Sequence, residues 1–237
     1  MGFFSKILNS FKSIRLNDKN RVNGYLLDHL LVGSMYAEQQ SAYLNSYETG
    51  LNKSDITKLV VTYWGITDKN QAVETLQSLH TRNQDKNLDA VYKAFENPEN
   101  YVDLLKSNLP DEKDDFEYYL DLFRQLRNVV PLLTEQKIIT DFAQLKRTKD
   151  SGWNYGRGVF LARCCHELGY ISEKELIEYL EKSHRELKQY CSTWKEYTAS
   201  YIVGRAIWSG DYNNGMIQIA DDLLNNSKSP LKNRMYL

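Results

Sequence analysis

The chain has 237 residues, 42% of them hydrophobic, which is enough to bury a core without support from disulfide bonds. With 30 basic and 31 acidic residues it carries a formal net charge of -1, so its overall field would attract neither nucleic acid nor an anionic membrane. Three cysteines, an odd number, are typical of a reducing cytoplasm, and no apolar run approaches the roughly 18 residues of a membrane span.

An amphipathic helix is predicted at the N-terminus, within residues 1–20. Basic side chains lie among its polar positions, and its apolar residues share one helical face. The apolar face consists of Phe3, Phe4, Ile7, Leu8, Phe11 and Ile14. We interpret this segment as a helix docked on its own domain. Contact with a membrane surface is the alternative, because basic amphipathic N-terminal helices bind there.

Residues 21–237 show helical rather than alternating periodicity, with only four prolines in the whole chain. The pattern predicts an all-α fold, a compact multi-helix arrangement in a single domain. Helices are expected approximately over residues 3–14, 22–47, 54–63, 68–82, 86–96, 98–107, 111–128, 134–145, 152–168, 173–190, 194–208 and 214–225.

The best-marked helix boundary is the stretch "ELGYISEKELIEYL". Gly169 suits the left-handed conformation that closes a helix, while Ser172 and Glu175 form a capping box for the next one. The short connection predicts an antiparallel αα-hairpin of residues 152–168 and 173–190. Thr193 and Glu196 repeat the capping box before a third core helix over 194–208.

Arginines interrupt the apolar faces of two of these helices. Arg157 shares a helical face with Trp153, and Arg205 has Tyr201 and Trp208 about one turn away on either side. Arg163 lies on a different face from Arg157 and is expected to form a local ion pair with Glu167, four residues on.

Gly156 and Gly204 each precede one of the interrupting arginines. Glycine weakens a helix interior by about 1 kcal/mol relative to alanine, and close approach of another backbone is a usual compensation. We therefore expect tight helix crossings, where the guanidinium groups of Arg157 and Arg205 stack on aromatic rings. Two interpretations remain open: the arginines organise the packing, or they line a cleft for a carboxylate or phosphate.

No catalytic, metal or cofactor site is expected. Cys164, Cys165, His166 and Cys191 do not have a familiar zinc spacing, and a cysteine nucleophile with a histidine base has no specific signature here. Phosphate-binding, dinucleotide-binding, metalloprotease and serine-hydrolase motifs are absent. Seventeen tyrosines could line a protein-binding surface, although core filling is the more ordinary explanation.

Two segments carry family motifs. In "YWGITDKNQAVETLQSLH", Trp64 and Ile66 precede an A-x-x-x-L-x-x-L pattern that begins at Ala72. The segment from "GWNYGR" to "YIVGRAIW" contributes further elements, namely Trp153, Arg157, Ala162, Arg163, Gly169, Tyr170, Trp194, Tyr201, Gly204, Arg205 and Trp208. Over approximately residues 50–210 the chain resembles a bacterial family catalogued as domain of unknown function 1266.

This resemblance implies a helical bacterial protein with no established activity, and it implies that the second Gly-Arg pair belongs to the family pattern. The chain departs from the family at Asn154, where Asp is frequent. If that Asp forms an ion pair with an arginine in the family, Asn154 provides only a neutral partner in this chain.

The sequence favours a non-catalytic protein-binding or adaptor module, including an immunity-type protein that neutralises a toxin. The alternative is an enzyme or sensor that binds an anionic small molecule through Arg157 and Arg205, beside Trp153, Tyr201 and Trp208. A protein partner or an anionic small molecule is therefore expected, and nucleic acid is not.

Overall fold

The computed structural model describes residues 14–109, 113–209 and 214–237. Within these ranges the secondary structure is helical, with one isolated β-bridge between Thr193 and Tyr236. The N-terminal part contains α1 (Tyr25–Leu31), α2 (Ser34–Gln39), α3 (Lys53–Thr57), the π-helix η2 (Lys58–Tyr63), α4 (Lys69–Thr81), the 3₁₀-helix η3 (Arg82–Gln84), α5 (Lys86–Glu96) and α6 (Tyr101–Asn108). The C-terminal part contains α7 (Lys113–Glu135), α8 (Phe142–Thr148), α9 (Ser151–Glu167), α10 (Glu173–Leu187), α11 (Trp194–Ser209) and α12 (Asn214–Asn225). The all-α prediction is confirmed.

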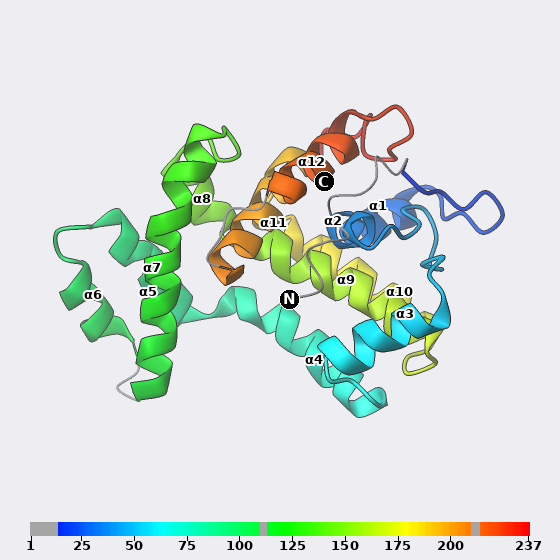
Figure 1. Cartoon of the computed structure of the whole chain (residues 1–237), viewed down its shortest axis with the longest axis horizontal. Coiled ribbons are helices and arrows are strands. Elements are labelled where there is room, and N and C mark those ends of the chain that lie inside the picture. Colours follow the sequence, from blue (N-terminus) through cyan, green and yellow to red (C-terminus); the bar gives the residue numbers. More distant parts are fainter. Residues whose placement is uncertain (1–13, 110–112, 210–213) are drawn as a thin grey trace.

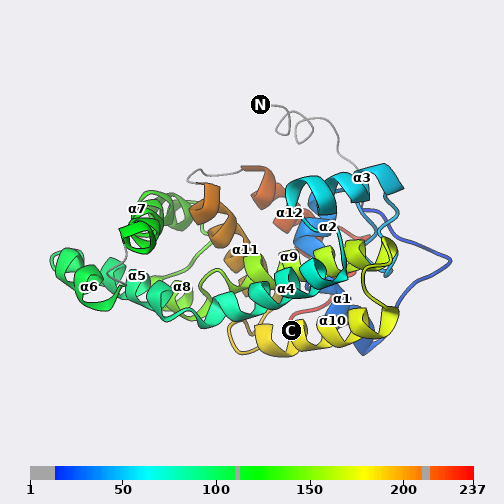
Figure 2. The same ribbon diagram turned by 90° about the horizontal axis from the view of Figure 1, so that it is seen from below.

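Helices α9 and α11 form the centre of the molecule (Figure 1). Helix α9 packs on α2, α4, α10 and α11, and α4, α9 and α10 run side by side (Figure 2). Helix α11 also packs on α7, which lies with α5 and α6 at one end of the molecule. Both central helices are buried on nearly all sides, which explains why apolar residues surround their arginines.

Glycines bring α9 and α11 close together. A methyl group at Gly152 would lie 2.5 Å from the backbone oxygen of Tyr197, and one at Gly156 would lie 2.9 Å from the Tyr201 ring. From the other side, a methyl group at Gly204 would lie 2.3 Å from Trp153 Cβ. The expected tight crossing at Gly156 and Gly204 is confirmed, and Gly152 is a third member of it.

Residues 22–47 do not form the single long helix that the sequence predicts. Helix α2 ends at Gln39, and Ser41 has a positive φ of 56°. The backbone that follows is held by Arg163, which donates hydrogen bonds to the carbonyl oxygens of Tyr43, Tyr47 and Glu48. The donor comes from α9, more than a hundred residues away in the chain, so local periodicity could not reveal these contacts.

The same contacts overturn the expected ion pair between Arg163 and Glu167. Arg163 is buried and donates its hydrogen bonds to backbone carbonyls, while the Glu167 carboxylate accepts a hydrogen bond from the Thr49 amide. Two helix boundaries also differ: α7 continues through Pro131 to Glu135, so the next helix begins only at Phe142. The expected helix over residues 3–14 lies almost wholly outside the described residues.

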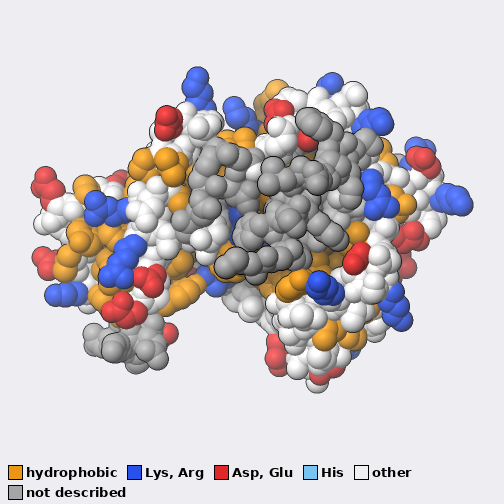
Figure 3. Space-filling model, viewed as in Figure 1, with side chains coloured by type: hydrophobic (Ala, Val, Ile, Leu, Met, Phe, Trp, Pro, Cys, Tyr) orange, Lys and Arg blue, Asp and Glu red, His pale blue; other side chains and the backbone are white. Residues whose placement is uncertain are grey.

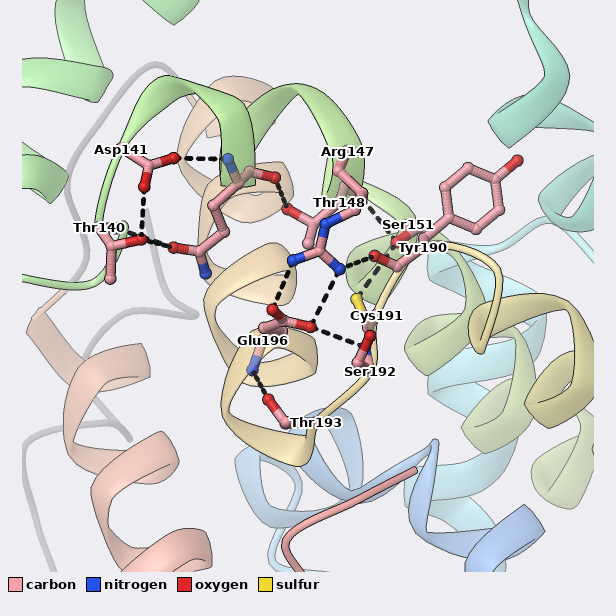
Figure 4. Close-up of polar contacts among 11 residues, drawn as sticks. Thr140, Asp141, Arg147, Thr148, Ser151, Tyr190, Cys191, Ser192, Thr193 and Glu196 are labelled. Atoms are coloured by element: carbon pink, nitrogen blue, oxygen red, sulfur yellow. Dashed lines mark hydrogen bonds and ion pairs between the residues drawn. The ribbon is translucent and has the colours of Figure 1, made fainter.

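The cap before α10 is confirmed, and the cap before α11 is different. Ser172 and Glu175 form the reciprocal capping box, after Gly169 with a φ of 79°. Before α11, Thr193 Oγ1 accepts from the Glu196 amide, but the Glu196 carboxylate accepts from the Ser192 amide and from Arg147 (Figure 4). The start of α11 is thereby tied to α8.

Candidate ligand-binding site

A pocket of about 80 Å³ lies between the central helices and the segment that runs from η3 into α5. Its wall contains three charged residues, Arg82, Asp150 and Arg157, and two tryptophans, Trp153 and Trp208. Leu88, Tyr92, Leu122, Gly204 and Ile207 complete it. The pocket therefore combines positively and negatively charged side chains with a largely apolar wall, as small-molecule sites do.

Arg157 stacks on Trp153, as expected. The guanidinium carbon lies 4.1 Å from the centre of the Trp153 ring and 5.4 Å from that of Trp64. Nε donates to the Trp153 carbonyl at 3.2 Å, and Nη2 donates to Asn154 Oδ1 at 3.0 Å. Burial lowers the pKa of Arg157 to about 10, so the group remains a cation at neutral pH.

Arg205 lies beside the pocket rather than in its wall. It is 8% exposed, and its guanidinium carbon is 5.8 Å from the Trp153 ring centre and 5.1 Å from that of Trp208. Among the described residues no acceptor reaches its Nε, and the buried hydroxyl of Tyr201 also lacks a partner. Tyr201 contacts Trp153 edge to face, with 5.0 Å between ring centres. Of the residues singled out from sequence, Trp153, Arg157 and Trp208 line the pocket, and Arg205 and Tyr201 support its tryptophans.

Asp150 and Arg82 were missed by the sequence analysis. Asp150 precedes α9 and is 9% exposed, yet its side chain does not cap the helix and its Oδ1 has no hydrogen-bond partner among the described residues. Burial raises the pKa of this carboxyl, and the nearby charge of Arg82 opposes the rise. Arg82 itself donates to the Tyr118 hydroxyl. Only the fold brings residues 82 and 150 together, so no local pattern could have identified them.

Asn154 occupies the position where the family often has Asp. Its Oδ1 accepts from Arg157, and its Nδ2 donates to Asn83 Oδ1 at 3.0 Å. The amide thus makes the arginine contact that was inferred for the carboxylate, and it adds a link to η3.

The described cysteines and histidines do not assemble a reactive centre. Cys164, Cys165 and Cys191 are buried free thiols whose pKa values are raised by desolvation. No group of three or more potential metal ligands occurs in the part of the chain that the structure describes.

One cluster has the composition of a catalytic triad. His80 Nε2 lies 2.8 Å from Ser183 Oγ, and His80 Nδ1 lies 3.6 Å from the Glu186 carboxylate. Ser183 is fully buried, and its hydroxyl donates to the Tyr179 carbonyl. Because no substrate could reach this serine without opening the packed α4–α10 contact, we interpret the cluster as a core hydrogen-bond network.

None of the helices among the described residues has the length and apolar character needed to cross a membrane. No curated protein and no solved structure matches the chain. A family model described as Protein of unknown function (DUF1266) matches residues 60–235, a range that includes every residue in the pocket wall. The chain therefore belongs to the DUF1266 family.

Proposed function

We propose that this protein binds a small anionic ligand, a carboxylate or a phosphate, in the pocket beside Trp153. The observation that carries the proposal is the state of the arginines: Arg82 and Arg157 face the pocket without an ion pair among the described residues, and Arg205 Nε is buried without an acceptor. Within the described ranges, Arg157 makes two hydrogen bonds to protein acceptors and Arg82 makes one, fewer than the five N–H donors of a guanidinium group. Arginines that only organised packing would have more of their donors occupied by protein acceptors.

The charge of the site supports the same ligand class. Arg82, Arg157 and the adjacent Arg205 oppose a single carboxylate, that of Asp150. A guanidinium fork binds carboxylate and phosphate oxygens in pairs, and the surrounding tryptophan rings lower the local dielectric, which strengthens such contacts. The pocket wall contains no serine, threonine, cysteine, histidine or lysine, and the described residues form no metal-ligand cluster. The proposal is therefore binding or sensing without a catalytic step.

Thermal unfolding in the presence of a panel of carboxylates, phosphorylated metabolites and nucleotides tests the proposal. A ligand at about 100 times its Kd adds about 2.7 kcal/mol, which raises the midpoint of a chain this size by about 5 to 10 °C. Arg82→Met should abolish the shift, because Arg82 lines the pocket. The variant should still fold, because Arg82 is exposed. Arg185→Met, at an exposed arginine on α10, is the matched control. A panel without any shift would contradict the proposal.

Protein binding is the second candidate, and the exposure of Trp208 favours it. This side chain is 65% exposed at the pocket, and tryptophan is enriched at the centres of protein interfaces. Elsewhere, hydrophobic side chains are interspersed with charged ones over the end of the molecule that contains α5, α6 and α7 (Figure 3). In this alternative the chain is an adaptor or an immunity-type protein. Size-exclusion chromatography of Trp208→Ser against the wild type with a candidate partner would test it.

The buried free thiols support the cytoplasmic location expected from sequence, because a reducing compartment keeps cysteines unpaired.

A further inference from the structure

Asp150 is the buried acid in the wall of the anion-binding pocket, and one oxygen of its carboxylate lacks a hydrogen-bond donor. It stands directly before α9 without capping that helix, and its Oδ1 has no hydrogen-bond partner among the described residues. A buried carboxylate oxygen without a donor is costly, so native structures rarely leave one. The pocket therefore contains an unfilled acceptor in addition to its arginines.

The connection between α8 and α9 fixes Asp150 in this position. Ser200 Oγ, on α11, accepts from the Gly152 amide at 2.8 Å and donates to the Lys149 carbonyl at 2.9 Å. Gly204 presses on the same residue, since a methyl group there would lie 2.9 Å from Asp150 Cβ. The backbone on both sides of Asp150 is thus held by Ser200.

Neighbouring cations do not neutralise Asp150 by direct pairing. Lys149 pairs with Asp89, and Arg82 donates to Tyr118. Arg157 donates to the Trp153 carbonyl and to Asn154. Guanidinium donors and a carboxylate acceptor therefore face one space of about 80 Å³ without saturating each other.

We propose that the ligand carries a hydrogen-bond donor, an ammonium or hydroxyl group, next to its anionic group, and that Asp150 accepts this hydrogen. The inference rests on the proposed function and specifies its ligand class as amino or hydroxy acids and their phosphate counterparts. A pocket of about 80 Å³ is smaller than the sites that hold drug-sized ligands, so small members of this class are the ones to test. Alanine and lactate are two such acids, and propionate differs from them only by lacking the donor.

Kd values from thermal unfolding of the full chain with propionate, lactate and alanine test the inference. Ethyl phosphate and 2-aminoethyl phosphate form the corresponding phosphate pair. We expect a donor-bearing ligand to bind about tenfold more tightly than its partner, equivalent to 1.4 kcal/mol. Asp150→Asn should reduce this preference to within about twofold while anion binding persists. Asp89→Asn, at the exposed partner of Lys149, should leave the preference unchanged.

Equal binding of propionate, lactate and alanine, together with equal binding of the two phosphates, would overturn this inference and leave the anion-binding function in place. A preference that survives Asp150→Asn would also overturn it. If that variant does not fold, the comparison of matched ligands on the wild type decides alone. Absence of binding by every acid and phosphate would overturn the proposed function, and this inference with it.

Discussion

Gly204 and Trp153 meet at the crossing of α9 and α11, where a methyl group at position 204 would lie 2.3 Å from Trp153 Cβ. Gly204→Ala therefore forces the two helices apart. Alanine favours a helix interior by about 1 kcal/mol, but overpacking costs about 1–3 kcal/mol, and here the clash is with a Cβ that cannot rotate away. We expect a net loss of about 1–2 kcal/mol in the free energy of unfolding measured with urea. Asn70→Ala, at an exposed position of α4, is the control, and a Gly204→Ala protein as stable as the control would contradict the packing described.

Replacement by methionine should destabilise the protein strongly at Arg163 and little at Arg205, although both arginines are buried. Arg163 satisfies three backbone carbonyls, and Arg163→Met leaves them without their donor, so we expect a loss of about 2–4 kcal/mol. Arg205 Nε has no acceptor, so Arg205→Met should change the free energy of unfolding by less than about 1 kcal/mol. Urea unfolding of the two variants side by side checks the contrast. Equal losses would mean that Arg205 is as firmly paired as Arg163.

Asn154→Asp should be tolerated, because rotation of the Asn83 amide lets Nδ2, which is buried without a partner, donate to the new carboxylate. Arg157 Nη2 would donate to the other oxygen. We expect stability within about 1 kcal/mol of the wild type at neutral pH. A paired carboxylate has a pKa below its unfolded value, so the stability it adds is present above the unfolded pKa and is lost as pH falls. Asn154→Leu, which removes both contacts, should cost about 2–3 kcal/mol at every pH. Urea unfolding at several pH values distinguishes the variants.

Glu38 should make stability fall as pH rises. Burial, together with the charge of Asp222, raises the pKa of Glu38 from 4.5 to about 7. Between about pH 4.5 and 7 the folded state therefore holds a proton that the unfolded state has released. The stability that this bound proton adds is lost as pH rises through that interval. Glu38→Gln should remove the slope and gain on the order of 1–2 kcal/mol at pH 8 relative to the wild type, once screening by solvent is allowed for. Glu99→Gln, at an exposed glutamate, is the control. An unchanged pH dependence in Glu38→Gln would show that this carboxyl ionises normally.

Local signals predicted α9, α10 and α11 well. The capping box at Ser172 and the helix periodicity on either side of it depend on contacts within a few residues, and the bounds of α9, α10 and α11 follow them closely. The break after α2 was missed because Arg163, more than a hundred residues away, provides the donors that replace helical hydrogen bonds there. Long-range satisfaction of the backbone has no local pattern.

For the same reason, only the part of the candidate site that lies on helical faces could be predicted from the sequence. Arg157, Trp153 and Trp208 share helical faces that can be read from spacing, and the glycines beside the arginines indicated where the helices touch. Arg82 and Asp150 complete the wall from a helix end and a connection. Neither position differs locally from an ordinary surface arginine or an ordinary helix cap, so only the folded chain distinguishes them.

The pocket wall is built from segments that enter it from far apart in the chain, around residues 82–92, 122, 150–157 and 204–208. A ligand bound there would connect all of them at once, as a cross-link does. Opening motions that separate α5 and α7 from α9 and α11 would first have to release it, so amide hydrogens in all four segments should exchange more slowly with the ligand bound. The site would then determine how freely one end of the molecule moves against its centre.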